Sequence, residues 1–226
     1  GQHVVLQCCS EFIDLLDQLG MRDSLHMQSR FDCTMIRNGR RATLREASLP
    51  APLHLLPSLL RLPWLTLGDK IGIARALRAA TRAIPASGDM ASWLRAQRQS
   101  ERAVRIFWEP FLVPALNASL RQVSAESALF VVRTAFLEHR DAARIGWTTV
   151  PLARIAELAA AHADAVHLRS GVGALLHDGA RVHSIVLEDA VRDDFDAVVA
   201  AVPPHRLLPM LDGADAITGA ALSAFT

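Results

Sequence analysis

"FDAVVAAVPPHRLLPML", residues 195–211, is the stretch of sequence that decides the fold class. After Asp196 the chain runs through residues 197–202 without a charged side chain and stops at two prolines, Pro203 and Pro204. A short apolar run bounded in this way predicts a strand buried on both faces, as in a parallel sheet covered by helices. The stretch therefore indicates an α/β protein.

Other segments also have the composition of strands. The opening "GQHVVL", residues 1–6, predicts a short strand, and residues 34–46 surround Asn38-Gly39, a strong hairpin signal. Residues 165–187 predict a strand, a loop and two further strands around a turn at Asp178-Gly179. The first and last strands need neighbours that these pieces do not supply, so we expect the middle of a larger α/β protein.

A block of helical patterns, from about residue 45 to residue 163, separates these pieces. In front of the block, one helix is expected to stop at Gly20. Pro110 and Pro114 are expected to end or kink the helix that follows Ser100. Serines precede four of the helices and are the expected N-caps. They are Ser10, Ser92, Ser100 and Ser124.

Composition and charge exclude several classes of protein. The chain carries 24 basic and 23 acidic residues, a balance that offers no electrostatic case for nucleic-acid binding. Its three cysteines suit neither a disulfide framework nor the spacing of metal ligands, so we predict no metal site. The most apolar region, residues 49–68, contains four prolines together with His54 and Arg61, which argues against a membrane-spanning helix.

Two groups of side chains have a structural and a functional interpretation. An aromatic group is expected to pack in the core, and the alternative is that it lines an apolar ligand channel. It comprises Trp93, Phe107, Trp108 and Phe111. A basic group on one face of a helix is expected to be solvated, and the alternative is contact with anionic lipid head groups. It comprises Arg75, Arg78 and Arg82.

Four segments carry a resemblance to a known family. They are "GQHVVLQCCSEFIDLLDQLG" (1–20), "LPAPLHLLPSLLRL" (49–62), "SERAVRIFWEPFLVPALN" (100–117) and residues 195–211. Together they resemble the squalene-associated FAD-dependent desaturases, which are hydroxysqualene dehydroxylases of bacterial hopanoid pathways. This family lies within the flavin amine oxidase and phytoene desaturase superfamily. The resemblance extends over essentially the whole chain, and "FWEPFLVPALN" and "GQH" are its most specific parts.

The resemblance implies a mixed α/β fold, namely part of a Rossmann-like FAD-binding domain with an inserted, mainly helical substrate domain. Residues 1–44 and 164–212 would belong to the FAD-binding domain, residues 45–163 to the substrate domain, and residues 213–226 to a return into the substrate domain. The family's Gly-rich dinucleotide fingerprint would precede residue 1. The chain is therefore expected to be an internal fragment that aggregates or binds FAD weakly when isolated.

FAD is the cofactor that the resemblance implies, and it also implies the residues that hold it. They are Gly1, Gln2, His3, Val172, Val202 and Pro203. The first three are expected beside the flavin ring, where His3 is the candidate to protonate a leaving hydroxyl near neutral pH. The backbone of Val172 is expected to address the adenine, and the last two residues are expected near the ADP portion.

The implied reaction is the reductive dehydroxylation of hydroxysqualene to squalene, with Trp108 and Phe111 lining a tunnel for the apolar isoprenoid. The alternative enzyme is a carotenoid or phytoene desaturase, or another amine-oxidase-like flavoprotein, that runs the flavin oxidatively. A third interpretation is a non-catalytic module that binds a membrane or a partner. We expect a cytoplasmic protein with peripheral contact at the inner face of the cell membrane.

Overall fold

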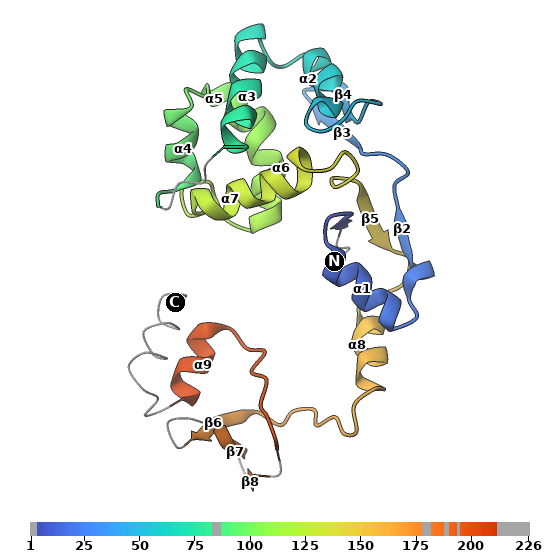
Figure 1. The fold of residues 1–226 in the computed structure, drawn as a ribbon, viewed down its shortest axis with the longest axis vertical. Coiled ribbons are helices and arrows are strands. Elements are labelled where there is room, and N and C mark those ends of the chain that lie inside the picture. Colours follow the sequence, from blue (N-terminus) through green and yellow to red (C-terminus); the bar gives the residue numbers. More distant parts are fainter. Residues whose placement is uncertain (1–3, 83–86, 178–181, 188–189, 194, 212–226) are drawn as a thin grey trace. The chain divides into compact units, whose positions relative to one another are not determined.

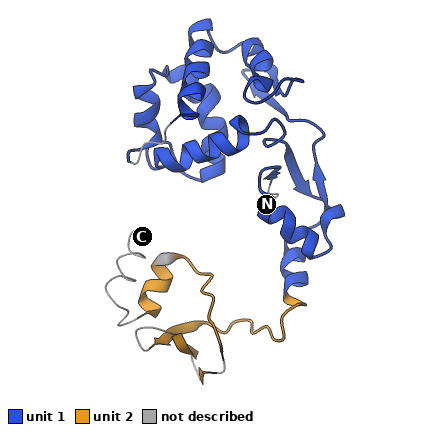
Figure 2. Ribbon diagram, in the orientation of Figure 1, with its two compact units in different colours: residues 1–159 blue, residues 160–226 orange. Residues whose placement is uncertain are grey.

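A computed structural model describes the chain apart from residues 1–3, 83–86, 178–181, 188–189, 194 and 212–226 (Figure 1). The chain separates into two compact units, residues 1–159 and residues 160–226 (Figure 2). The first unit contains a three-stranded sheet, a hairpin and a group of helices, and the second contains a three-stranded sheet and one helix. The fold is mixed α/β, as predicted, although every described ladder is antiparallel rather than parallel.

The sheet of the first unit has the order β1 (Val4–Leu6), β5 (Ile145–Thr148), β2 (Leu25–Met27). The strand predicted at the start of the chain is confirmed for its last three residues. Gly146 lies in the central strand, opposite Val5 on one side and Met27 on the other. A Cβ at this position would lie 2.7 Å from Met27 Cε and 2.9 Å from the backbone oxygen of His26, so the strands close only around a glycine.

Helix α1 (Ser10–Gln18) packs Ile13 and Leu16 into the core. The expected N-cap is corrected by one residue, because Ser10 is already helical and Cys9 precedes it without a side-chain cap. The helix is followed by Gly20 at φ +65°, which confirms the predicted stop. The positive φ explains why a glycine ends this helix.

The predicted hairpin is confirmed as β3 (Asp32–Arg37) and β4 (Arg40–Arg45), paired in register from Asp32↔Arg45 to Arg37↔Arg40. Asn38 and Gly39 form its two-residue loop with φ of 48° and 71°. Two consecutive positive φ angles match the turn that suits the twist of the strands, and Asn-Gly tolerates both.

Short helical elements fill the rest of the first unit (Figure 1). They are η1 (Arg22–Ser24), η2 (Leu53–Leu55), α2 (Leu56–Arg61), α3 (Leu67–Ala80), α4 (Met90–Ala96), α5 (Glu101–Ala103), η3 (Val104–Trp108), α6 (Glu109–Leu116), α7 (Ala125–Val132), η4 (Arg133–Leu137) and α8 (Ala153–Ala160), of which η3 and η4 are π-helical.

Two of the predicted serine caps inside the helical block are confirmed. Ser100 Oγ accepts from the backbone N–H of Ala103 at 3.0 Å, and Ser124 Oγ accepts from that of Ser127 at 3.1 Å. Ser92 is not a cap, because Asp89 lies three residues earlier and its Oδ1 accepts from the Ser92 N–H at 2.8 Å. Asp is as good an N-cap as Ser. Because Asp89 takes this role, α4 begins at Met90, earlier than predicted.

Pro110 does not end its helix, because it lies in the first turn of α6, which continues to Leu116. It has no N–H to bond the preceding turn, and the chain forms the π-helical turn η3 directly before α6. Pro114 also lies inside α6, which continues to Leu116 and ends at Asn117 with φ 49°. The left-handed Asn117, rather than either proline, therefore marks the end of the helix.

Two apolar clusters form the core of the first unit. One gathers buried residues of the helices α3, α4, α6 and α7, and Trp108 and Leu129 are among them. The other joins the hairpin to α2 and α3 through Phe31, Leu44 and Leu59. Partly buried Phe107 packs against both clusters, so the π-helical turn η3 holds them together.

The second unit has a sheet of β6 (Val172–His177), β7 (Val182–Leu187) and β8 (Val191–Arg192), with α9 (Pro204–Met210) packed against β6. The strand predicted at residues 197–202 is wrong for this structure, and Val199 is 92% exposed. The strand predicted at residues 165–168 is likewise absent. No described strand pairs with either run, and a strand without a partner leaves its backbone groups unpaired.

Candidate functional site

An apolar cavity of about 400 Å³ opens between η2, α2 and α3 in the first unit. Aliphatic and aromatic side chains dominate its wall, and two polar residues of α3 complete it. The lining residues are Pro52, Leu53, Leu55, Leu56, Leu59, Ala74, Leu77, Arg78, Thr81, Phe107, Phe136 and Leu137. A concave apolar site of this size suits a lipophilic small molecule.

Helix α3 supplies one stripe of this wall. Ala74, Leu77, Arg78 and Thr81 follow one another at helical spacing, so they share a face. The start of the helix is held by a capping box, in which Thr66 accepts from the N–H of Asp69 and the Asp69 carboxylate accepts from the N–H of Thr66. The capping box orients the helix that forms the wall.

The inner wall comes from the two π-helical turns. Phe107 of η3 and Phe136 of η4 line the cavity, and Phe111 lies between them, 6.0 Å from Phe107 and 5.4 Å from Phe136 by ring centroids. Both pairs are edge-on, which is the arrangement that aromatic quadrupoles favour. Phe107 and Phe136 therefore form the aromatic floor of the cavity, and Phe111 packs against both rings without lining it.

Trp108 and Phe111, the residues expected to line a tunnel, border a smaller void behind this floor. The void has about 20 Å³, room for a single water-sized sphere, and it shares Phe107 and Phe136 with the cavity. Trp108 is 2% exposed and its indole N–H donates to Gln99 Oε1 at 3.0 Å. Trp108 is therefore held in the core, and Phe107 is the ring of this aromatic group that lines the larger cavity.

The polar part of the cavity wall is small. The Thr81 hydroxyl is occupied, because Oγ1 donates to the backbone oxygen of Arg78 at 2.8 Å. The guanidinium of Arg78 is the ionisable group among the lining residues. The described wall thus offers apolar contact and one cation, and none of its side chains is a general acid. It can hold an apolar molecule but does not carry chemistry by itself.

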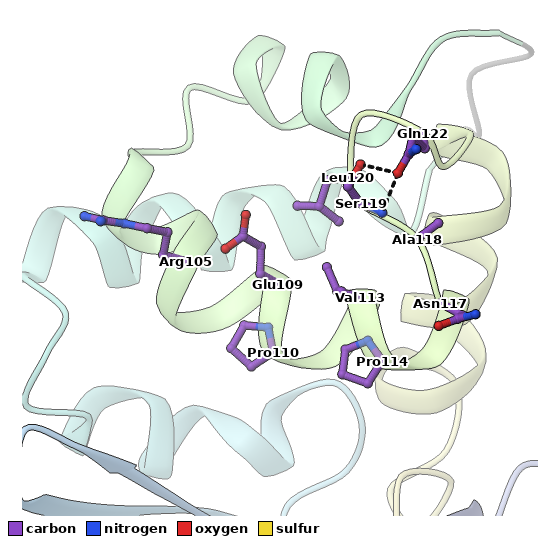
Figure 3. A pocket seen from close by; sticks show the side chains of 10 residues that line it. All are labelled: Arg105, Glu109, Pro110, Val113, Pro114, Asn117, Ala118, Ser119, Leu120 and Gln122. Carbon is purple, nitrogen blue, oxygen red and sulfur yellow. Dashed lines mark hydrogen bonds between the residues drawn. The ribbon is translucent and has the colours of Figure 1, made fainter.

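A second hollow, of about 830 Å³, lies along α6 and has a mixed lining. Figure 3 shows Arg105 and Glu109 on its wall, with Pro110 following Glu109 along the helix. Ser119 closes another part of it and donates to Gln122 Oε1 at 2.7 Å. Charged and polar groups on its wall make this hollow a poor match for a long hydrocarbon.

The candidate FAD residues are distributed over two parts of the chain. Gly1, Gln2 and His3 lie outside the described residues. Val172 begins β6 opposite Leu187, and the ladder shifts register directly after it. Val202 and Pro203 are exposed, and Pro203 precedes the first turn of α9 in the same unit. Val172 is half-buried, so of these three residues only Val202 and Pro203 are exposed to solvent.

A buried ion pair that the sequence did not indicate joins Glu46, directly after β4, to Arg144, directly before β5. The Glu46 side chain is 7% exposed and accepts from Arg144 Nη2 at 2.9 Å and from the backbone N–H of Phe31 at 2.8 Å. Burial raises the pKa of Glu46, but the bonds from Arg144 and Phe31 outweigh it and the net pKa is lowered. These contacts keep Glu46 ionised and structural.

His54 is the other unforeseen group. Its side chain is fully buried, and neither ring nitrogen has a hydrogen-bond partner in the described part of the chain. Burial lowers the pKa of His54 below its usual 6.5, and the positive charge of Arg140 lowers it further against the opposing effect of Glu46. A neutral imidazole therefore lies inside the proline-rich segment.

Among the described residues, no group of His, Cys, Asp and Glu side chains is arranged to hold a metal ion. No helix in the same residues is long and apolar enough to span a bilayer.

The chain matches one family model and is similar to several solved structures, among them the two that follow. The model of the family "Flavin containing amine oxidoreductase" matches residues 1–221. No curated protein matches the chain. An oxidoreductase from Methanosarcina mazei is similar over 98% of the chain, with a TM-score of 0.64 and 14% identity. A protein assigned as a protoporphyrinogen oxidase from Exiguobacterium sp. 255-15 is similar over 97%, with a TM-score of 0.59 and 15% identity. The chain spans 51% of each of these structures.

Proposed function

The chain belongs to the family of flavin-containing amine oxidoreductases, and on that premise we propose that the protein carrying it is an FAD-dependent oxidoreductase acting on an apolar isoprenoid. The observation that supports this substrate class is the apolar cavity of about 400 Å³ with its aromatic floor. Within this proposal, residues 45–163 are the substrate domain, and residues 1–44 and 164–212 belong to the FAD-binding domain.

The proposed reaction is the conversion of hydroxysqualene to squalene. When bound, reduced FAD supplies a hydride to the carbon that loses the hydroxyl, and the hydroxyl leaves as water after taking up a proton. His3 is the proposed donor of that proton, because an imidazole can deliver one near neutral pH. The resemblance in residues 1–20, 49–62, 100–117 and 195–211 supports this particular substrate.

The residues of this chain would bind the substrate and FAD, orient them, and exclude water from the site. Leu55, Leu77 and Phe107 would hold the hydrocarbon by apolar contact, and their burial of its surface would keep water from the reacting carbon. The backbone of Val172 would contact the adenine of FAD, and the exposed residues Val202 and Pro203 would lie near its ADP portion. Gly1 and Gln2 would lie beside the flavin ring. Trp108 and Phe111 would support the aromatic floor from behind.

The experiment adds bulk to the cavity without touching the core. Ala74 lies in the cavity wall but is itself exposed, so Ala74→Trp narrows the cavity at little cost to folding. The FAD-loaded protein is incubated with hydroxysqualene and a reductant, and squalene is measured by gas chromatography. We expect Ala74→Trp to lower turnover on the order of 10-fold to 100-fold, because the substrate is displaced from its productive position.

Ala115→Trp is the matched control. Ala115 is exposed on α6 and lines neither the apolar cavity nor the second hollow, so turnover should stay at the wild-type level. Equal turnover in wild type and Ala74→Trp would show that the cavity is not the substrate site. New conjugated double bonds from phytoene, with no squalene formed, would replace the proposal by an oxidative desaturase. If the protein takes up no FAD, the proposal fails and the interpretation as a non-catalytic binding module is favoured instead.

A further inference from the structure

Large apolar side chains of η2, α2 and α3 are exposed, and one of them, Leu53, lines the cavity. Leu53 and Leu60 are 50% exposed, Leu67 is 68% exposed and Ile71 is 51% exposed. Leu67 and Ile71 are one turn apart on α3, and Lys70 of the same helix donates to the backbone oxygen of Leu60 at 2.7 Å. Helices α2 and α3, which are labelled in Figure 1, pack against each other, and the exposed side chains of η2, α2 and α3 are named here the α2–α3 face.

The α2–α3 face carries an excess of positive charge. Residues 47–82 contain five basic residues and one acidic residue. The acidic residue, Asp69, has a side chain that is 8% exposed, and it accepts hydrogen bonds from Thr66 and Ser100. The basic residues are Arg61, Lys70, Arg75, Arg78 and Arg82. The face therefore presents positive charge to solvent without an exposed carboxylate.

The two kinds of side chain follow one stripe of α3. Leu67 and Ile71 precede Arg75, Arg78 and Arg82 at spacings of three and four residues, so apolar groups occupy the first half of the stripe and cations the second. Arg78 also lines the cavity. Arg78 therefore belongs both to the cavity wall and to the exposed stripe of α3.

From this arrangement we propose that the α2–α3 face docks on the surface of an anionic lipid bilayer. The leucines and the isoleucine enter the interface between head groups and acyl chains, while the arginines contact lipid phosphates. Charge complementarity selects a bilayer over a second copy of this chain, because two such faces would repel each other. The inference deepens the proposed function, since an apolar substrate dissolved in the bilayer would reach the cavity without crossing water.

Vesicle binding tests the proposal with the protein carrying the chain and without any turnover. Sedimentation is compared for vesicles of phosphatidylcholine alone and for vesicles of phosphatidylcholine with phosphatidylglycerol. We expect binding to the anionic vesicles that weakens between about 0.1 M and about 0.5 M NaCl, because salt screens the arginines. The double variant Arg75→Gln/Arg82→Gln should bind more weakly on the order of 10-fold, since each basic residue near the surface contributes to the attraction.

The control is Arg105→Gln/Arg121→Gln, which removes the same charge from exposed positions around another hollow. It should bind as wild type does. Leu67→Ser/Ile71→Ser should weaken binding at both salt concentrations, because it removes apolar contact rather than charge. Circular dichroism confirms that each variant keeps its helices.

Three results would overturn the proposal. They are equal binding to neutral vesicles, no loss of binding in Arg75→Gln/Arg82→Gln, and a dimer in sedimentation equilibrium that Leu67→Ser/Ile71→Ser abolishes. Turnover of a substrate supplied in detergent is measured separately. Turnover without vesicle binding would contradict only the docking proposal. Vesicle binding without turnover would contradict only the proposed reaction.

Discussion

The indole Nε1 of Trp108 donates a hydrogen bond to Oε1 of Gln99 over 3.0 Å, and the amide of the same Gln99 donates to the backbone oxygen of Gly72 over 2.9 Å. Trp108 is thereby connected to α3, the helix that forms one wall of the apolar cavity. An aromatic residue expected in the tunnel wall thus positions the wall from within the core.

Trp108→Phe should destabilise the fold by about 1–3 kcal/mol, because it leaves Gln99 Oε1 without its donor and creates a void. Urea denaturation followed by circular dichroism measures the change. Trp64→Phe is the matched control: Trp64 packs against the second apolar cluster, and its buried indole N–H has no acceptor in the described residues. An equal loss in both variants would show that the hydrogen bond to Gln99 contributes nothing.

The stability of the protein should fall as the pH drops below 6.5. Burial lowers the pKa of His54, so in this range the unfolded chain takes up a proton at His54 that the folded chain refuses. The free energy of unfolding then decreases with falling pH by at most about 1.4 kcal/mol per pH unit. Urea midpoints between about pH 7.5 and about pH 5 measure this slope, which His54→Phe should flatten. His139→Gln, at an exposed position, should keep it.

Glu46→Gln should destabilise the fold by about 1–3 kcal/mol, since it leaves the guanidinium of Arg144 without its carboxylate. The pKa of Glu46 is lowered from 4.5, so the contribution of its carboxylate is present above pH 4.5 and is lost as the pH falls through the lowered pKa. Thermal melting at neutral pH tests the magnitude. Arg22→Gln breaks the exposed pair with Asp17 and should cost less than about 1 kcal/mol.

Gly146→Ala should destabilise the fold by about 1–3 kcal/mol, because the new methyl group meets Met27 Cε and the backbone oxygen of His26. The side chain of Met27 can move, but the backbone oxygen cannot, so Gly146→Ala/Met27→Ala should not recover wild-type stability. Gly68→Ala is the control. Its new Cβ has room in the first turn of α3, and it should stabilise by about 0.5–1 kcal/mol. A neutral Gly146→Ala would contradict the strand spacing described for β5.

The features predicted correctly from the sequence are those that nearby residues determine. Asn38-Gly39 forms the expected turn, Ser100 and Ser124 cap their helices, and Gly20 follows the end of α1. Each of these depends on backbone geometry or on a hydrogen bond within three residues. Where such predictions failed, a nearby competitor prevailed: Asp89 took the cap expected of Ser92.

The features that were missed join residues far apart in the chain. Glu46 and Arg144 are 98 positions apart. Phe107 and Phe136 line the same cavity only because η3 and η4 pack against the same two clusters. At residues 197–202 a prediction failed for the same reason. Their composition suits a buried strand, but no described strand pairs with them. Composition alone cannot reveal whether a partner is present.

The sequence by itself determined the mixed α/β class, the turn at Asn38-Gly39, the caps at Ser100 and Ser124, and the family resemblance, because these reside in local patterns, whereas the turn predicted at Asp178-Gly179 lies outside the described residues. The tertiary structure alone decided that Trp108 lies behind the cavity, that Phe107 and Phe136 line it, and that apolar and basic side chains share the α2–α3 face. The physical reason is that burial, ion pairing and the shape of a cavity depend on which distant segments come into contact.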